Sequence, residues 1–491
     1  MTENIRLPRK RLSLVRLVAI VLLSNLIVPQ VWTDTSSELT VPTTVPVPTL
    51  SNADKDPSTD TAPPTTTSTA SLGAFQETLA KAQNSDPTAQ FNLGVMYYDG
   101  EGVPQDYKKA FKWFTKAAEQ GHANALSYLG WMYDNGEGVP QDYKKAIEWF
   151  TKAAEQGYAD SQNNLGLMYL QGKEIPQDYK KAVEWFTKAA EQGAASSQFS
   201  LGLMYLEGKG VPQDYRKAIE WFTKAAEQGH ADSQHNLGVM YDNGEGVPQD
   251  YRKAIEWFTK AAEQGLALAQ LQLGLMYHQG KEIPQDYKKA VEWFTKAAEQ
   301  GAVDAQYNLG VMYHKGKGVP QDYRKAIEWF TKAAEQGAVS AQFNLGVMYV
   351  KGEGVPQDYR KAIEWYSKAA EQGHDAAQYS LGLMYNNGEG VPQDFKKAVE
   401  WYAKAAEQGD MGALNNLGVM YVKGEGVPQD YRQAYFYYNL SAALSTTNED
   451  RTLAEKNRDG IAQKLTKEDL AAEQKRAREW FERFQAKEKK P

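Results

Sequence analysis

Residues 86–121 read DPTAQFNLGVMYYDGEGVPQDYKKAFKWFTKAAEQG, and this unit recurs along most of the chain. The pair Leu93-Gly94 returns every 36 residues, without insertion, as far as Leu417-Gly418. Pro104 keeps the same spacing as far as Pro428, and Trp113 keeps it as far as Trp401. Fixed periods of about 20–50 residues are typical of solenoids and related arrays. The chain is therefore expected to contain ten structural repeats.

Each unit is predicted to fold as two helices. The first runs from about residue 87 to residue 98, because Ala89 and Leu93 begin an apolar face at helical spacing. The glycines and the proline of residues 100–104 break this helix with turn chemistry. Asp106 is placed to cap the second helix by accepting a backbone N–H. Gly121 follows where a helix C-terminus needs a left-handed residue.

Neither helix can bury its apolar side alone, so neighbouring units must stack to build a core. Gly94 lies inside a predicted helix, where glycine costs about 1 kcal/mol relative to alanine. Glycine at this point of every unit indicates that a neighbouring helix lies too close for a side chain. The predicted fold class is all-α: an α-solenoid of ten 36-residue helix-pair repeats with terminal capping helices.

Two loops depart from the repeat pattern. Residues 172–175 and 280–283 both read GKEI and lie three units apart, which indicates duplication of a three-repeat block. Glu174 and Glu282 replace the second glycine of the turn. We therefore expect that this position does not strictly require a positive φ.

The repeated unit resembles the Sel-one-like repeat family, which is related to tetratricopeptide repeats and has a longer loop between the paired helices. The resemblance covers roughly residues 86–443 and rests on Asn92-Leu93-Gly94, Met96-Tyr97, Gly100-x-Gly102-Val103, Asp106-Tyr107, Ala110, Trp113 and Lys116-Ala117-Ala118. It implies a right-handed superhelix that acts as a protein-binding scaffold, often exported in bacteria. A cysteine-rich branch of the family has been linked to β-lactam binding or hydrolysis. This chain has no Cys, so that activity is not transferred to it.

The amino terminus has the pattern of an export signal. Five basic residues between Arg6 and Arg16 precede an apolar run from Leu17 to Val28, which is shorter than the about 17–25 residues of a bilayer-spanning helix. No Ala-x-Ala site follows, so residues 1–32 are predicted to be a signal peptide or a signal anchor. Residues 33–70, rich in Thr, Pro and Ser, are predicted to be a disordered linker. The expected location is periplasmic or extracellular, with membrane attachment only through a possible N-terminal anchor.

The repeats, predicted over residues 86–445, need a cap at each end to keep apolar surface from water. Residues 71–85 are predicted to form an N-terminal capping helix through Phe75 and Leu79. Residues 446–491 are predicted to form C-terminal capping helices. The last one begins near Lys467, where Thr466 and Asp469 resemble a capping box.

The composition excludes several kinds of chemistry. The 491 residues contain no Cys, which excludes disulfides, Cys-ligated zinc, iron–sulfur clusters and thiol catalysis. A net charge of −7 leaves no basic excess for nucleic acid. Residues 166–173 resemble a phosphate loop, but five residues separate the two glycines and no strand precedes them. No enzyme activity, cofactor or metal is therefore predicted.

The six histidines suit neither a metal site nor a general base. His278 and His314 occupy equivalent positions one repeat apart, and helix spacings of about 8–10 Å separate such positions too far for a shared metal. His122, His230 and His374 lie at unit junctions and are expected on the surface.

A variable stripe on the first helices is the candidate partner-binding surface. The positions of Phe91 and Tyr98 fall opposite the apolar side of the helix and change from unit to unit, while the frame stays constant. Aromatic residues dominate binding hot spots. The candidate residues are Phe91, Tyr98, Phe199, His235, Leu271, His278, Tyr307, His314, Phe343 and Tyr379. These aromatics could instead pack between neighbouring helices, and that alternative stays open.

The predicted function is a non-enzymatic repeat scaffold that binds a protein or peptide through its concave face. One alternative is an envelope hydrolase that acts on a β-lactam or on peptidoglycan. A second alternative is a structural spacer whose repeats set a length.

Overall fold

The computed structural model describes residues 69–172, 175–280, 283–445 and 447–488. Over these residues the chain forms 23 helices, α2 to α24, and no strand. The predicted all-α class is confirmed. The predicted signal segment, residues 1–32, and residues 33–68 of the predicted linker lie outside the described residues.

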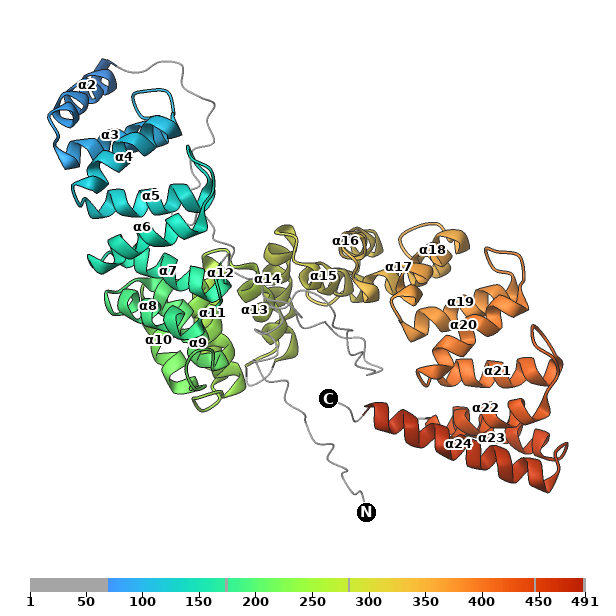
Figure 1. Cartoon of the computed structure of the whole chain (residues 1–491). Coiled ribbons are helices and arrows are strands. Elements are labelled where there is room, and N and C mark those ends of the chain that lie inside the picture. The colour runs from blue at the N-terminus through green and yellow to red at the C-terminus, as the bar shows by residue number, and fades with distance from the viewer. Residues whose placement is uncertain (1–68, 173–174, 281–282, 446, 489–491) are drawn as a thin grey trace. The chain divides into compact units, whose positions relative to one another are not determined.

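Ten helix pairs follow one another along the chain (Figure 1). The pairs are α3 (Pro87–Asp99) with α4 (Tyr107–Glu119), α5 (Ala123–Asn135) with α6 (Tyr143–Glu155), α7 (Ala159–Gln171) with α8 (Tyr179–Glu191), α9 (Ala195–Glu207) with α10 (Tyr215–Glu227), α11 (Ala231–Asn243) with α12 (Tyr251–Glu263), α13 (Ala267–Gln279) with α14 (Tyr287–Glu299), α15 (Val303–Lys315) with α16 (Tyr323–Glu335), α17 (Val339–Lys351) with α18 (Tyr359–Glu371), α19 (Asp375–Asn387) with α20 (Phe395–Glu407), and α21 (Met411–Lys423) with α22 (Tyr431–Leu444). Before them lies α2 (Thr69–Gln83), and after them lie α23 (Asn448–Ala462) and α24 (Lys467–Glu488). The predicted solenoid of ten pairs with terminal helices is confirmed.

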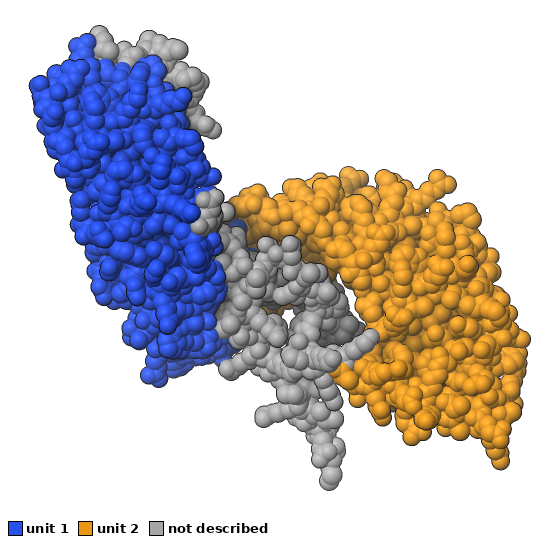
Figure 2. Space-filling model, in the orientation of Figure 1, with its two compact units in different colours: residues 1–32, 42–273, 281–283 blue, residues 33–41, 274–280, 284–491 orange. Residues whose placement is uncertain are grey.

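The chain divides into two compact units, and each is described by itself (Figure 2). Unit 1 contains α2 to α12 and the residues of α13 up to Leu273. Unit 2 contains the rest of α13, from Gly274 onward, and α14 to α24. Within each unit a helix packs mainly against its neighbours in sequence, as expected of a solenoid.

The first helix of the first pair, α3, begins and ends at residues that satisfy its free backbone groups. Before α3, the carboxylate of Asp86 accepts the N–H groups of Thr88 and Ala89 at 2.9 and 3.1 Å. Pro87 opens this helix, where the N–H that proline lacks would have no partner anyway. Gly100 ends it with a φ of 78°, in the left-handed region that glycine adopts without strain.

The second helix begins after an aspartate in every pair. Asp106 Oδ1 accepts the N–H of Lys109 at 3.0 Å, and an aspartate caps the nine later second helices in the same way. The N–H of Asp106 donates to the carbonyl of Tyr97 at 2.8 Å. Gln105 Nε2 donates to the carbonyl of Tyr98 at 2.7 Å. The loop therefore holds the two helices as one hairpin.

The glycine inside the first helix marks the closest approach of the two helices in a pair. A Cβ added at Gly94 would lie 2.5 Å from Cε1 of Phe114. Every helical glycine at this position meets a Phe or Tyr ring in the same way. The prediction that a neighbouring helix leaves no room for a side chain is confirmed.

The second glycine of the loop lies close to the backbone of the preceding repeat. Gly138 has a φ of 74°, and a Cβ added there would lie 2.5 Å from the carbonyl oxygen of Tyr107 in the preceding repeat. The described glycines at this position in later repeats share the positive φ and the close contact. The expectation drawn from Glu174 and Glu282 stays a prediction, because those two glutamates lie outside the described residues.

Buried glutamines tie one repeat to the next. Gln162 in α7 donates from Nε2 to the carbonyl of Ala154 at 3.1 Å, and its Oε1 accepts Gln192 Nε2 at 2.7 Å. The Ala154 carbonyl lies in the last turn of α6, where backbone carbonyls lack intrahelical donors. Leu126 and Leu414 occupy this position in repeats two and ten, and a leucine cannot make this bond.

The last second helix, α22, differs from the others on its outer side. Phe436 and Leu440 stand where α6 has Glu148 and Lys152. Both apolar side chains are buried, in a cluster that also includes Ala477 of α24. The terminal helix α24 therefore covers the outer side of the tenth repeat.

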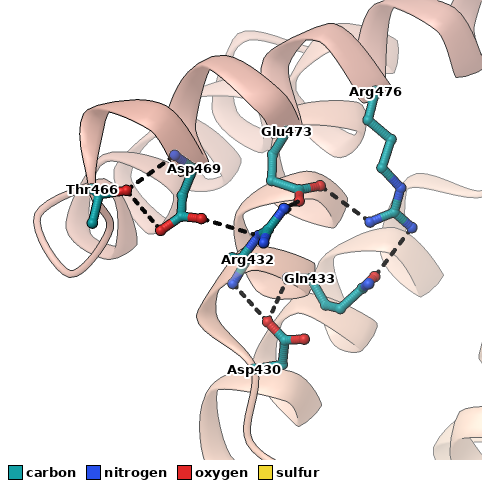
Figure 3. A network of polar contacts seen from close by, with 7 residues as sticks. All are labelled: Asp430, Arg432, Gln433, Thr466, Asp469, Glu473 and Arg476. Carbon is teal, nitrogen blue, oxygen red and sulfur yellow. Dashed lines mark hydrogen bonds and ion pairs between the residues drawn. The ribbon is translucent and has the colours of Figure 1, made fainter.

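Ion pairs hold α24 on α22 (Figure 3). Arg432 contacts Asp469, with 3.4 Å from Nε to Oδ1, and Glu473, with 3.0 Å from Nη2 to Oε1. Glu473 also pairs with Arg476 Nη1 at 3.1 Å, and the guanidinium of Arg476 lies 3.8 Å from the ring centroid of Phe436. Glu473 is only 4% exposed, and these two arginines are its ion-pair partners.

Candidate protein-binding site

The exposed side of the first helices forms the candidate surface. It consists of the four positions equivalent to Thr88, Asn92, Val95 and Asp99, whose spacing places them on one face of a helix. In α3, α5, α7, α9 and α11 each of these positions is exposed or half-buried. We call the residues at these four positions the first-helix strip.

Predicted binding residues at the position of Phe91 lie beside the strip and pack between helices. Each of five aromatic rings lies 5.6–5.9 Å from the Phe or Tyr ring of its own second helix; these are Phe91, Phe199, Tyr307, Phe343 and Tyr379. Of the predicted binding residues at this position, four are buried, namely Phe199, His235, Leu271 and Tyr307. The half-buried members Phe91, Phe343 and Tyr379 keep surface that a partner can reach. A role in partner binding stays a prediction for this position.

Three junction histidines take part in the same packing. The stacked pairs are Phe91–His122, Phe199–His230 and Phe343–His374, with ring centroids 4.7, 4.8 and 4.6 Å apart. Each Nδ1 accepts a backbone N–H of the helix that follows, as His122 does from Ala125 at 3.4 Å. Burial lowers the pKa of all three imidazoles, which favours the neutral form that can accept. The expectation of plain surface histidines is corrected: they are helix caps.

His235 takes the place of an aromatic ring in repeat five. Its ring centroid lies 5.5 Å from that of Phe258, and the side chain is 6% exposed. Burial lowers the pKa of this imidazole to about 4. Its Nε2 has no hydrogen-bond partner among the described residues. The ring therefore packs as an uncharged side chain.

The predicted residues equivalent to Tyr98 lie at the ends of first helices, against the following repeat. The Tyr98 hydroxyl donates to Glu137 Oε2 at 2.5 Å, and burial together with this carboxylate raises the pKa of the hydroxyl, so it remains a donor. His314 Nε2 lies 3.0 Å from Glu353 Oε2 of the next repeat. His278 is buried. Tyr98 and His314 therefore link neighbouring repeats.

The first-helix strip was not identified from the sequence, because helical periodicity does not show how many neighbouring helices pack against one helix. A first helix such as α5 contacts the second helix of its own repeat and that of the preceding repeat. Together these contacts leave a narrower exposed face than a single apolar stripe suggests. The polar residues Thr88, Asn92 and Asp99, at helical spacing, were the available signal.

The outer side of the second helices is charged and differs in character from the strip. Lys116 Nζ lies 4.3 Å from the ring centroid of Trp113, and Lys109 Nζ lies 5.2 Å from that of Tyr97. Both contacts recur in each repeat as far as Lys404 with Trp401 and Lys397 with Tyr385. The ammonium groups of these exposed lysines lie over the aromatic rings, as in cation–π contacts at a protein surface.

Other kinds of site were sought over the described ranges. In those ranges no group of three or more His, Cys, Asp or Glu side chains could hold a metal ion. None of the described helices has both the length and the apolar character needed to cross a membrane. A small hollow between α5 and α7 is lined by Trp131, Leu167 and Gln171, next to the first-helix strip.

Stacked helix pairs with one open face define the chain as an α-solenoid of short helical repeats. The family model of the Sel1 repeat matches residues 87–122, 123–158, 159–193, 195–230, 231–266, 267–301, 303–337, 339–374, 375–410 and 412–445, one match for each helix pair. The chain belongs to the Sel1 repeat family, as the resemblance indicated. Proteins built from these repeats are generally scaffolds for protein interaction and typically not enzymes.

Two solved structures are similar to this chain. A Sel1 repeat protein from Oxalobacter formigenes is 36% identical, with a TM-score of 0.52, and the match covers 63% of this chain and 90% of that one. A protective antigen of uropathogenic Escherichia coli with an SLR fold is 38% identical, with a TM-score of 0.47, and the match covers 84% of this chain and 95% of that one.

Among curated proteins, a putative sel1-like repeat-containing protein of Acanthamoeba polyphaga mimivirus is similar over a short stretch. It is 44% identical over 45 residues, which make up 9% of this chain. The match spans only 8% of the length of that viral protein. This similarity therefore concerns the repeat unit.

Proposed function

We propose that this chain is a non-enzymatic scaffold that binds a protein or peptide through the first-helix strip, on the side expected to be concave. The main support is that the strip stays open in unit 1 while the other sides of the same helices pack against neighbours. Caps and glutamine links hold the frame constant. On that frame the position of Val95 becomes Trp131 in repeat two and Leu167 in repeat three. Solenoids present binding surfaces in this way.

The half-buried members of the predicted stripe are included in the proposed surface. Phe91, Phe343 and Tyr379 border the strip, and Tyr98 and His314 lie at its ends. Aromatic side chains at such edges suit an interface because they bury large areas at low cost in side-chain entropy. The buried members of the stripe support the frame beneath it.

Site-specific photo-cross-linking tests the surface. A photoreactive amino acid replaces Leu203 on the strip or, as a matched control, Glu220 on the outer side of the same repeat. We expect the Leu203 probe to form a defined adduct in native extract and the Glu220 probe to form none. The partner, identified by mass spectrometry, should bind the purified Leu167→Ser/Leu203→Ser protein about tenfold more weakly. Equal cross-linking from both sides would contradict the proposal.

The two alternatives have direct tests. The purified chain should leave nitrocefin and peptidoglycan unchanged. Turnover of either substrate would favour the envelope hydrolase over the scaffold. Removing residues 195–230, one whole repeat, should abolish binding of a partner that spans it. A deletion that only reduces the function in proportion to the number of repeats removed would favour the structural spacer.

We further propose that residues 1–32 direct export. The support is the basic cluster followed by the apolar run of the sequence. A reporter fused after Ala70 should be active outside the cytoplasm, and Leu22→Asp/Leu23→Asp should prevent this. A reporter that stays inside the cell, or that ignores the double substitution, would contradict export.

A further inference from the structure

The first helices of unit 1 carry charge of one sign only. α3, α5, α7, α9 and α11 contain acidic residues and neither Lys nor Arg. The acidic residues are Asp99, Asp134, Asp160, Glu207, Asp232 and Asp242. In unit 2, by contrast, Lys315, Lys351 and Lys423 end α15, α17 and α21. The two units therefore offer different charge to a partner.

Two of these carboxylates are open to a ligand. Asp160 and Asp232 occupy the strip position of Thr88 and are exposed. In the described parts of the chain, no Lys or Arg forms an ion pair with either of them. Glu207, at another strip position, is already paired with Lys209 at 2.6 Å. Both aspartates lie in the first turn of a helix, whose dipole favours them without occupying their outward oxygens.

A row of apolar side chains runs along the same strip. The position of Val95 is apolar in all five first helices of unit 1, as Val95, Trp131, Leu167, Leu203 and Val239. All five side chains are half-buried, so each keeps apolar surface in contact with water. Apolar surface of this kind gains free energy when a partner covers it. The strip therefore combines apolar contact area with fixed negative charge.

We propose that the strip of unit 1 binds an extended peptide segment of a partner in which Lys or Arg alternates with apolar side chains, an inference that rests on the proposed scaffold function. The apolar side chains of the segment cover the row from Val95 to Val239, and its cations face Asp160 and Asp232. Charge complementarity selects this segment over an acidic one, because like charges opposed across an interface reduce affinity. The net charge of −7 adds long-range attraction for a cation.

Three synthetic probe peptides test the partner class. They share one length and one set of Leu and Val residues, and carry Lys, Ser or Glu at the remaining positions. Titrated against the full chain at low salt, the Lys peptide should bind about tenfold more tightly than the Ser peptide, and the Glu peptide most weakly. This difference should shrink at high salt, because ions screen exposed charges.

A charge-reversed pair locates the binding site. Asp160→Lys/Asp232→Lys should weaken the Lys peptide about tenfold and strengthen the Glu peptide. Glu148→Lys/Glu220→Lys, on the outer side of second helices, changes the net charge by the same amount. Its affinity for the Lys peptide should stay within about twofold of that of the parent chain. The affinity of Asp160→Asn/Asp232→Asn for the Lys peptide should fall between the affinities of the charge-reversed variant and the outer-side variant. This milder substitution still tests the site if the charge-reversed protein folds poorly.

The outcomes separate this inference from the scaffold proposal. Equal affinity for the Lys and Glu peptides, no binding of the Lys peptide, or equal losses in the strip and outer-side variants would overturn the cationic partner. If Leu167→Ser/Leu203→Ser still weakens the peptides that bind, the scaffold surface stands and only its charge preference falls. If that variant leaves every peptide unaffected, the strip itself is not the surface.

Discussion

The tenth helix pair uses its second helix in a way opposite to the pairs before it. In α6, Glu148 and Lys152 lie exposed on the outer side. In α22, Phe436 and Leu440 stand at the same positions and are buried under α24. The repeat frame therefore tolerates either solvent or protein on this side. Charged residues at these two positions leave this side open to solvent, whereas apolar residues there are covered by another helix.

The N-terminal end shows a different solution. There α2 imitates the second helix of a preceding repeat, because Gln90 Nε2 donates to the carbonyl of Ala82 at 3.1 Å. Gln162 makes the same bond to Ala154 between internal repeats. At the N-terminal end, α2 continues the packing of one repeat on the next. At the C-terminal end, α24 is an additional helix on the outer side of α22.

The largest effect is expected from removing the added helices. Deleting Glu449 to Pro491 exposes Phe436, Leu440 and their buried neighbours, whose burial is worth about 25 cal/mol per Å² of apolar surface. The shortened protein should aggregate or fray from α22, as seen by light scattering and thermal melting. Deleting residues 489–491 alone is the control and should change neither. A monomeric protein with an unchanged melting temperature would show that α24 is no cap.

The next effect concerns the position of Phe91, which is aromatic in several internal repeats and Asn415 in repeat ten. Changing Tyr307, Phe343 and Tyr379 together to Ala should cost several kcal/mol, since a buried Phe→Ala costs about 3–5 kcal/mol. In repeat ten this position is Asn415, which accepts a bond from Asn457 at 3.1 Å, and Asn415→Ala should cost about 1 kcal/mol. Thermal melts compare the two proteins. If the triple variant melts normally and only binding falls, the aromatics are partner contacts.

A smaller and local effect is expected at the ion pairs of α24. Glu473→Ala removes the carboxylate that accepts hydrogen bonds from Arg432 and Arg476, and because both arginines remain partly exposed this should cost about 2 kcal/mol. The loss should appear as faster amide hydrogen exchange in α24, with internal repeats unchanged. The exposed Glu468 in the same helix is the matched control, and Glu468→Ala should leave exchange as it was. Faster exchange throughout the chain would mean that α24 is not a separate local element.

The smallest effect is a dependence on pH that belongs to internal caps. His122, His230 and His374 have a lowered pKa in the folded chain, so the unfolded chain binds more protons as the pH falls below about 6.5. Their contribution to stability is complete above that pH and is lost below it, by about 1 kcal/mol for each lost cap. Chemical unfolding at pH 7.5 and pH 5 measures the change.

A triple change of these histidines to Asn provides the control for that measurement. Asparagine keeps a cap acceptor but does not titrate in this range. Asp86 serves as the cap of the first repeat, and its role does not depend on a histidine. The Asn variant should lose part of the difference between pH 7.5 and pH 5, and buried His235, whose pKa is lowered to about 4, should keep the rest. A difference of unchanged size would assign the whole effect to other groups.

Much of the fold could be read from the sequence because its signals are local. Asp106 caps the helix that it immediately precedes, and Gly100 has the positive φ that its place in the turn requires. The candidate site was harder to read. Of the ten predicted residues, Phe199, His235, Leu271, His278 and Tyr307 are buried. The open residues Asp160 and Leu203 were not singled out.

The sequence by itself determined the number of repeats, the helix boundaries, the caps and the turns, since each depends on residues within one or two helical turns. Only the tertiary structure decided which side of a first helix stays open, that His122 is a cap stacked on Phe91, and that Glu473 is buried between two arginines. The deciding contacts include pairs 30 or more positions apart, such as Gln162 with Gln192 and Phe91 with His122. Helical periodicity specifies a direction around one helix, but the neighbour that lies in that direction depends on how the repeats stack.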